Sequence, residues 1–227
     1  MARQWILSAA IAFVLAQNAS AQTFCWSESV DNATLGLGVG VSCTHGPPNF
    51  FATSNEFWRR YNPRIRGMGA DFEVRSVTFG VEDSTPGSTV QPATLRIFRD
   101  PTPGNPAPQV HLVLLREEVI DVPHLNGGLI THVFSTPVAC DAMGSADLVL
   151  QLAIPDGLTG QNRFFFGGNT AGQHSPTYIS SSPCGLVEPT DLTSIGFWNS
   201  HMIFDVCGAQ TSQLSTVYCT AKVNSLG

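Results

Sequence analysis

Apolar and polar residues alternate along the segment Phe72 to Val81, and the parity of this alternation changes near Arg75 and Ser76. Alternation with a period of two is typical of a strand that buries one face. A change of parity within such a strand predicts a β-bulge, or a strand that is buried on both faces. The segment therefore predicts one long strand with an irregularity at its middle.

Further short segments rich in Val, Ile, Leu and Phe follow, and Gly, Pro, Asn or Asp residues separate them. The predicted strands are Thr94 to Phe98, Val110 to Leu115, Leu129 to Phe134, Leu148 to Ile154, Arg163 to Phe166 and Met202 to Val206. Only Arg116 to Val122 could form a helical turn, and it lacks length and caps. Short strands with regular turn signals predict an all-β fold, a jelly-roll-like sandwich of two antiparallel sheets.

The stretch between residues 22 and 69 is rich in Gly, Asn, Ser and Pro, and it predicts irregular structure. Within it, Thr34 to Gly40 carries three glycines but is not followed by the Gly-Lys-Ser sequence of a phosphate-binding loop. We expect a flexible turn or a strand edge there.

The N-terminus has the features of a secretory signal peptide. Arg3 supplies a positive start, Trp5 to Ala16 is apolar but short for a membrane span, and Ala19 to Ala21 offers small residues for cleavage. We expect residues 1–21 to be a signal peptide, residues 22–207 to form the β-sandwich, and residues 208–227 to hold a linker and the start of a truncated C-terminal module.

The net charge and the cysteine content narrow the class of protein further. A net charge of −6 without a basic stripe argues against nucleic-acid binding. Six cysteines in an exported chain predict disulfides, and none has the spacing of a zinc site. The candidate pairs are Cys25–Cys43, which would close one irregular segment, and Cys140–Cys184.

Two regions resemble jelly-roll modules of secreted bacterial surface proteins. Asn55 to Tyr61 (NEFWRRY), followed by Phe72 to Glu82, resembles the opening of such modules, and Thr190 to Phe197 with His201 to Val206 resembles their closing strands. The resemblance covers about residues 25–207 and implies the fold and an extracellular adhesive or accessory role. It transfers no catalytic residue.

The end of the chain, Tyr218 to Gly227, resembles the start of a tail module of planctomycete-like secreted proteins. In those modules a second cysteine comes straight after the glycine. That cysteine is absent here, which leaves the pairing of Cys219 open. The sequence also leaves the pairing of Cys207 open.

The chain offers candidates for ligand binding but no catalytic signature. There is no Gly-x-Ser-x-Gly sequence, and the histidines have no spacing that ties them to a Ser or Cys nucleophile. Glu82 and Asp83, in a loop rich in oxygen ligands, are candidates for calcium, the one cofactor the sequence suggests. For a sugar, an aromatic ring beside polar groups is the usual platform, and the candidates are Trp58, Tyr61, Trp198 and Asn199.

These observations predict a secreted, non-catalytic binding or adhesion module whose partner is a glycan or a cell-surface protein. Two alternatives stay open: a secreted hydrolase with a dispersed active site, and a structural spacer domain of a surface protein. Two acidic residues meeting in a deep pocket would favour the hydrolase, and exposed aromatic residues would favour binding.

The signal peptide gives the first testable prediction. The secreted protein should begin at Gln22, because Ala19 to Ala21 places the cleavage site directly before it. N-terminal sequencing of material from the medium checks this, and an intact Met1 on mature protein would contradict it.

Overall fold

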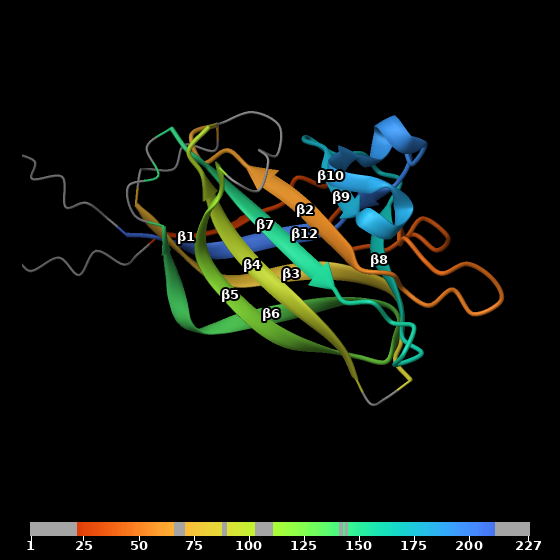
Figure 1. The fold of residues 1–227 in the computed structure, drawn as a ribbon. Coiled ribbons are helices and arrows are strands. Elements are labelled where there is room, and N and C mark those ends of the chain that lie inside the picture. The colour runs from red at the N-terminus through yellow and green to blue at the C-terminus, as the bar shows by residue number, and fades with distance from the viewer. Residues whose placement is uncertain are drawn as a thin grey trace, which may run out of the picture.

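The computed structural model describes residues 22–65, 71–87, 90–102, 111–140, 143 and 145–211. The predicted signal peptide and most of the predicted C-terminal linker and module, from residue 212 onward, lie outside these ranges. The described part is an all-β sandwich of two antiparallel sheets, which confirms the predicted fold class (Figure 1).

The first sheet is built around one long strand, β3 (Phe72–Thr85). On one side β3 pairs with β6 (Leu125–Cys140), and on the other with β12 (Phe204–Gln210) and then β8 (Arg163–Asn169). The sheet is completed by β1 (Gln22–Trp26) beside β12 and β11 (His201–Met202) beside β8.

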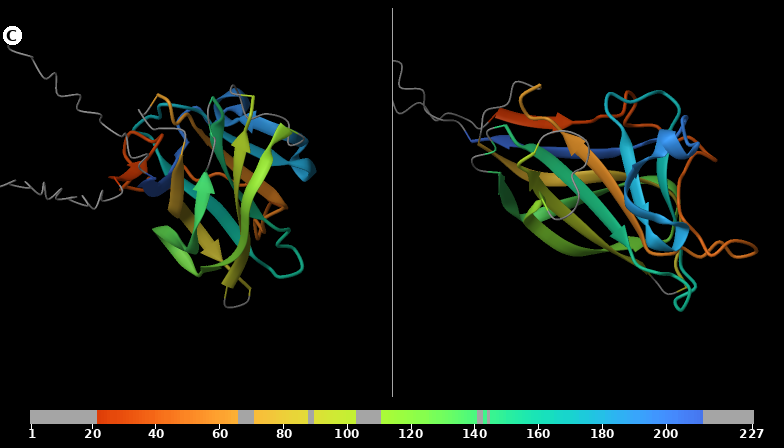
Figure 2. Two further views of the ribbon diagram at one scale, coloured as in Figure 1. Left: turned by 90° about the vertical axis from the view of Figure 1, so that its left-hand side faces the viewer. Right: turned by 45° about the horizontal axis from the view of Figure 1, so that its top comes forward.

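The second sheet has the order β10-β9-β2-β7-β4-β5. Its strands are β10 (Leu186–Asp191), β9 (Thr177–Ser181), β2 (Asn55–Tyr61), β7 (Asp147–Ile154), β4 (Val90–Asp100) and β5 (Val113–Pro123). Two short 3-10 helices, η2 (Ser182–Cys184) and η3 (Leu192–Ile195), flank β10. Figure 2 shows the two sheets stacked as layers.

The core lies between the layers and is filled by apolar side chains from both sheets. Fully buried members include Phe57, Phe72, Phe79, Leu95, Leu150, Phe164, Phe166 and Phe204. Phe166 joins the two sheets, because its ring lies 4.9 Å from that of Phe57 on β2 and 5.4 Å from that of Phe204 on β12. Burial of apolar side chains such as these is the main term that favours folding.

The predicted irregularity of the first long strand is present. The register of β3 against β6 shifts between Val74 and Ser76, and Arg75 is exposed at that point. One extra residue moves the inward positions from Phe72 and Val74 to Val77, and this is the parity change read from the sequence.

The expectation of irregular structure between residues 22 and 69 is wrong for two segments. β1 pairs with the last strand, β12, and β2 lies inside the second sheet between β7 and β9. Apolar and polar residues do not alternate in the sequence of β2, because Phe57 and Trp58 are adjacent and Arg59 and Arg60 follow them directly. The segment Arg116 to Val122 is part of β5 and not a helical turn.

Two disulfides connect parts of the chain that are distant in sequence. Cys25 is bonded to Cys207 across the paired strands β1 and β12, and Cys43, in the loop before β2, is bonded to Cys184 in η2. The predicted pairs Cys25–Cys43 and Cys140–Cys184 are therefore wrong. The reason is topological: the sandwich places the first strand against the last, and spacing along the chain carries no information about this.

The disulfide between Cys43 and Cys184 should contribute strongly to stability. It closes a loop with a sequence separation of 141, and in the chain-entropy model such a long loop corresponds to about 4–5 kcal/mol. Replacing both cysteines with Ser should lower the midpoint of urea unfolding accordingly.

Peptide mapping under non-reducing conditions checks the connectivity first. It should yield the linked pairs Cys25–Cys207 and Cys43–Cys184. A peptide linking Cys25 to Cys43 would contradict the structure.

Candidate functional site

A buried arginine of β2 holds together the loops that form one wall of the candidate site. The guanidinium of Arg59 is fully buried and donates through Nη1 to Gln173 Oε1 (2.8 Å) and to the Ser175 carbonyl (2.8 Å). Through Nη2 it donates to Ser29 Oγ (3.0 Å) and to the Met202 carbonyl (2.8 Å). These bonds join the loop after β1, the loop before β9 and the β11 strand.

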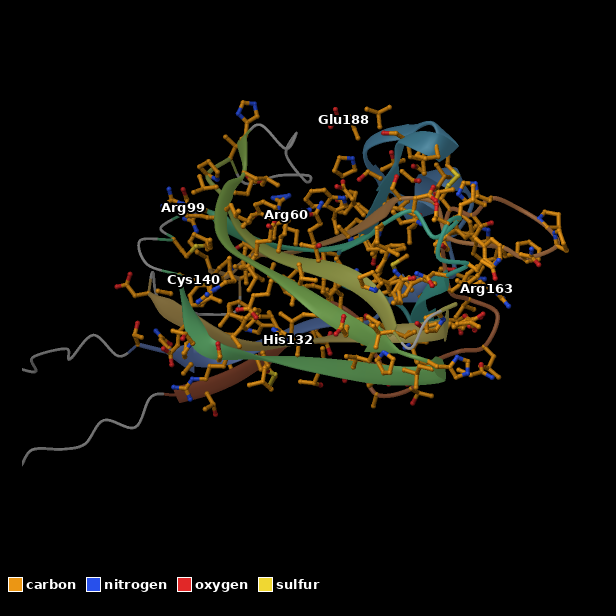
Figure 3. All side chains as sticks on the ribbon, turned by 60° about the horizontal axis from the view of Figure 1, so that its bottom comes forward. Arg60, Arg99, His132, Cys140, Arg163 and Glu188 are labelled. Atoms are coloured by element: carbon orange, nitrogen blue, oxygen red, sulfur yellow. A yellow bond between two sulfur atoms is a disulfide. The ribbon has the colours of Figure 1, made fainter. Side chains whose placement is uncertain are left out.

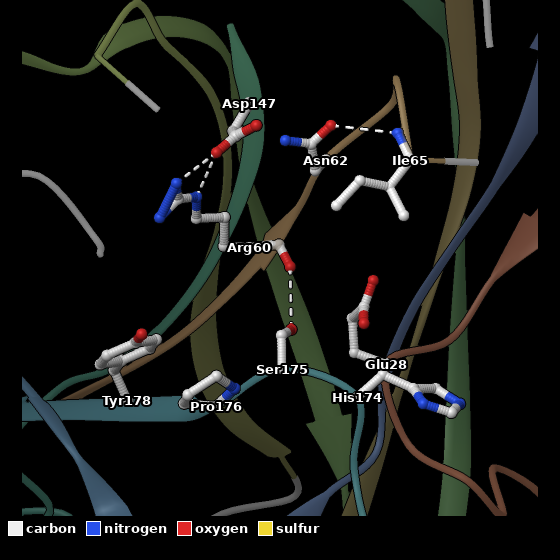
Figure 4. A pocket seen from close by; sticks show the side chains of 9 residues that line it. All are labelled: Glu28, Arg60, Asn62, Ile65, Asp147, His174, Ser175, Pro176 and Tyr178. Carbon is white, nitrogen blue, oxygen red and sulfur yellow. Dashed lines mark hydrogen bonds and ion pairs between the residues drawn. The ribbon is translucent and has the colours of Figure 1, made fainter. Parts of the chain in front are cut away.

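The neighbouring residue, Arg60, points to the opposite face of β2, as alternation along a strand requires. There it borders a pocket of about 430 Å³ (Figure 4). The wall opposite β2 and β7 comes from the loops that Arg59 anchors. The lining residues are Glu28, Arg60, Asn62, Ile65, Asp147, His174, Ser175, Pro176 and Tyr178.

We call this cavity the Arg60–Asp147 pocket. The ion pair between Arg60 and Asp147 forms its polar side. Both Nε and Nη2 of Arg60 donate to the same oxygen of Asp147, Oδ2, and the Asp147 side chain is only 1% exposed. Burial raises the pKa of Asp147, while the adjacent Arg60 opposes this shift by favouring the carboxylate.

The other sides of the pocket combine an amide with apolar surface. Asn62 Oδ1 caps the turn after β2 by accepting from the backbone N–H groups of Arg64 (3.1 Å) and Ile65 (3.2 Å). Tyr178, on β9, is nearly buried, and its pKa is raised by burial and by Asp191. Pro176 and Ile65 complete the apolar surface.

The sequence analysis did not identify this pocket. Arg60 and Asp147 are 87 residues apart, and neither lies in a recognisable motif. They meet because β2 and β7 pair with Arg60 next to Val149, two residues from Asp147 on the same strand. The one available signal was the pair of charged residues, Arg59 and Arg60, inside a segment that also carries three aromatic residues.

Of the four predicted sugar-binding residues, Trp198 and Asn199 are exposed. Trp198 is 66% exposed and the adjacent Phe197 is 40% exposed. The backbone that carries them is well held: Phe197 N–H donates to the Leu192 carbonyl (2.9 Å), and Ser200 N–H donates to the Phe197 carbonyl (3.1 Å). We call residues 196–200 the Trp198 turn.

Trp58 and Tyr61 are buried, which corrects the expectation that either presents its ring to solvent. Trp58 is 1% exposed, packs against Val149 and Tyr178, and donates from Nε1 to Ser180 Oγ (3.0 Å). The Tyr61 hydroxyl donates to the Phe204 carbonyl in the core. Both residues belong to β2, and side chains cover both faces of this strand: Tyr61 packs in the core between the sheets, and Trp58 packs in a separate cluster with Val149 and Tyr178.

The predicted calcium ligands are bonded to protein groups. The Glu82 carboxylate accepts from the backbone N–H groups of Gly38 (3.0 Å), Val39 (3.1 Å) and Gly40. Asp83 forms an ion pair with Arg163 at 2.8 Å. These contacts use oxygens that a calcium ion would need, and they explain the glycine-rich segment as a loop that wraps around Glu82.

Two features are absent from the described residues. Within the ranges given above, no three His, Cys, Asp or Glu side chains gather as a metal-binding group. No helix in that same part of the chain has the length and hydropathy needed to cross a membrane.

No family model and no curated protein matches this chain. Among solved structures, it is similar to the cysteine protease and lectin-like domains of Cwp84, a surface-layer-associated protein of Clostridium difficile, with a TM-score of 0.47 and 8% identity over 71% of this chain. It is also similar to the clostridial cysteine protease Cwp84 after propeptide cleavage, with a TM-score of 0.50 and 7% identity over 83% of this chain.

The matched regions cover 33% and 40% of those two chains, so this chain spans well under half of their length. At such low identity the likeness concerns the fold alone. The class is defined by this chain's own strands and disulfides, which make it a disulfide-bonded β-sandwich module.

The different positions of the two tryptophans predict different costs of truncation. Trp58→Ala should lower the free energy of unfolding by about 3–5 kcal/mol, because it empties a packed site. Trp198→Ala should change it by less than about 0.5 kcal/mol, because most of that ring is in solvent. Urea unfolding of the two variants provides the measurement, and similar losses in both would contradict the assignment.

Proposed function

We propose that this protein is a secreted, non-catalytic binding or adhesion module that recognises a glycan or another cell-surface partner through the Trp198 turn. The single observation that carries the proposal is the exposed ring of Trp198 on an ordered turn. Trp26 and Trp58, by contrast, are 6% and 1% exposed.

The turn is held in place before any partner arrives. Leu192, the first residue of η3, is fully buried, and the Asp191 side chain accepts from the backbone N–H of Thr193 (2.8 Å). Gly196, with φ of 99°, allows the chain to leave η3 in the left-handed conformation. A preorganised aromatic ring loses little conformational entropy on binding, which favours a role in recognition.

Export is part of the proposal. The N-terminal residues 1–21 have the pattern of a signal peptide, and the two disulfides are typical of proteins from oxidising compartments. An external location would place the Trp198 turn where glycans and surface proteins occur. The structural neighbours, which include a surface-layer-associated protein, are compatible with such a location but are similar only in fold.

Binding of the mature protein to a glycan array and to intact cells tests the proposal. Trp198→Ala should weaken binding about fivefold, as expected for the loss of an aromatic contact worth about 1 kcal/mol. Val119→Ala is the matched control, since Val119 is 72% exposed on the distant edge strand β5 and its truncation should leave binding unchanged.

Three results would contradict the proposal. Absence of binding to any glycan or cell surface would favour a spacer domain. Equal binding by wild-type protein and Trp198→Ala would remove the turn as the site. Release of reducing sugar from a bound glycan, lost in Asp147→Asn, would favour the hydrolase, because Glu28 and Asp147 line the same pocket.

A further inference from the structure

One oxygen of a buried carboxylate in the Arg60–Asp147 pocket lacks a donor. Both bonds from Arg60 go to Asp147 Oδ2, and Oδ1 has no hydrogen-bond partner among the described residues. A carboxylate oxygen that is shielded from water and unbonded is unfavourable, and such groups in native proteins call for an explanation. Asp147 borders the pocket, so a hydrogen-bond donor that occupies the pocket can satisfy this oxygen.

A fixed donor lies on another side of the same pocket. The two backbone N–H groups that bond to Asn62 Oδ1 identify the remaining amide atom as the nitrogen. This nitrogen makes no hydrogen bond to a described residue, and in Figure 4 it points toward Asp147. The pocket therefore offers one acceptor and one donor to the same ligand.

The apolar surface and the size limit the shape of that ligand. Tyr178 and Pro176 contribute apolar surface to the pocket lining, together with Ile65, which is 81% exposed. A volume of about 430 Å³ is within the usual range for small-molecule sites. A flat ring with apolar faces and polar edges fits these walls.

The charges favour a neutral ligand. Arg60 already neutralises Asp147, so a cation near Oδ1 would be repelled by the guanidinium. Glu28 is a further acidic residue of the lining and disfavours an anion. A hydroxyl group, in contrast, can donate to Asp147, and its neighbour on a ring can accept from Asn62.

We propose that the Arg60–Asp147 pocket binds a single neutral sugar ring, with one hydroxyl donating to Asp147 Oδ1 and another accepting from the Asn62 amide, while Tyr178 and Pro176 cover a ring face. This site shares no residue with the Trp198 turn. The inference goes beyond the function proposed above, and either site can fail without the other.

The test replaces the Asn62 donor with an acceptor and the Asp147 acceptor with a donor, each by a substitution of nearly the same shape. Asn62→Asp keeps the oxygen that caps the turn and replaces the donor with an acceptor, and Asp147→Asn keeps an oxygen for Arg60 and replaces the acceptor with a donor. Each should weaken binding about tenfold, the effect of losing one good hydrogen bond. Asn126→Asp, at an exposed position on β6, is the control with the same change of charge as Asn62→Asp and should bind normally.

The probes are the methyl glycosides of glucose, galactose, mannose and N-acetylglucosamine, measured by saturation-transfer NMR and calorimetry on the mature protein. At least one should bind, and Trp198→Ala should retain this binding, which separates the pocket from the turn. The circular dichroism spectrum and thermal midpoint of each variant show whether it is folded.

The inference is overturned if no glycoside binds, or if folded Asn62→Asp and Asp147→Asn variants bind as tightly as the wild type. Saturable binding of N-acetyl-lysine amide in place of every glycoside would also overturn it, and would indicate that the pocket receives a basic side chain of a partner. If Asp147→Asn does not fold, the Asn62→Asp comparison decides the question alone.

Discussion

The structure depends on a charge that is buried between its two layers. Arg59 lies on β2, with its side chain inside the sandwich, and burial lowers its pKa while Tyr61, Glu28 and Asp205 oppose that shift. An unpaired guanidinium in this position would cost several kcal/mol. The chain therefore has to bring acceptors to it, and they come from the β11 strand and from two loops that are over a hundred residues apart in sequence.

The same constraint shapes the outer face of β2. The loops that satisfy Arg59 carry Glu28, His174 and Pro176, which line one side of the Arg60–Asp147 pocket. Arg59 and Arg60 point to opposite faces of a single strand, so the inner arginine positions the wall that the outer arginine faces. Figure 3 shows Arg60 and His132 among the side chains that extend from the strands of the sandwich. The pocket is thus a consequence of how the core is closed.

Other contacts connect the edge strands of the two sheets and the two ends of the described chain. Glu118 on β5 bonds to His132 on β6 at 2.8 Å and so links the edge strands of the two sheets. At the ends of the fold, β1 pairs with β12, and the disulfide between Cys25 and Cys207 joins them. These contacts place the first and last described strands side by side. The Trp198 turn, held by Leu192 and Asp191, projects from this frame.

Local patterns in the sequence predicted β3 with its bulge and the central parts of β4, β5, β6, β7, β8 and β12, because alternation with a period of two depends only on neighbouring residues. They did not predict β1, β2, β9 or β10. The sequence also indicated an exported chain with disulfides, from its cysteine count and N-terminus. Only the tertiary structure decided which cysteines pair, that Trp58 is buried while Trp198 is exposed, and that Arg60 meets Asp147. Each of these depends on which strands lie side by side. That arrangement follows from packing both sheets around one core and from satisfying Arg59, and neither is visible in any short segment of the chain.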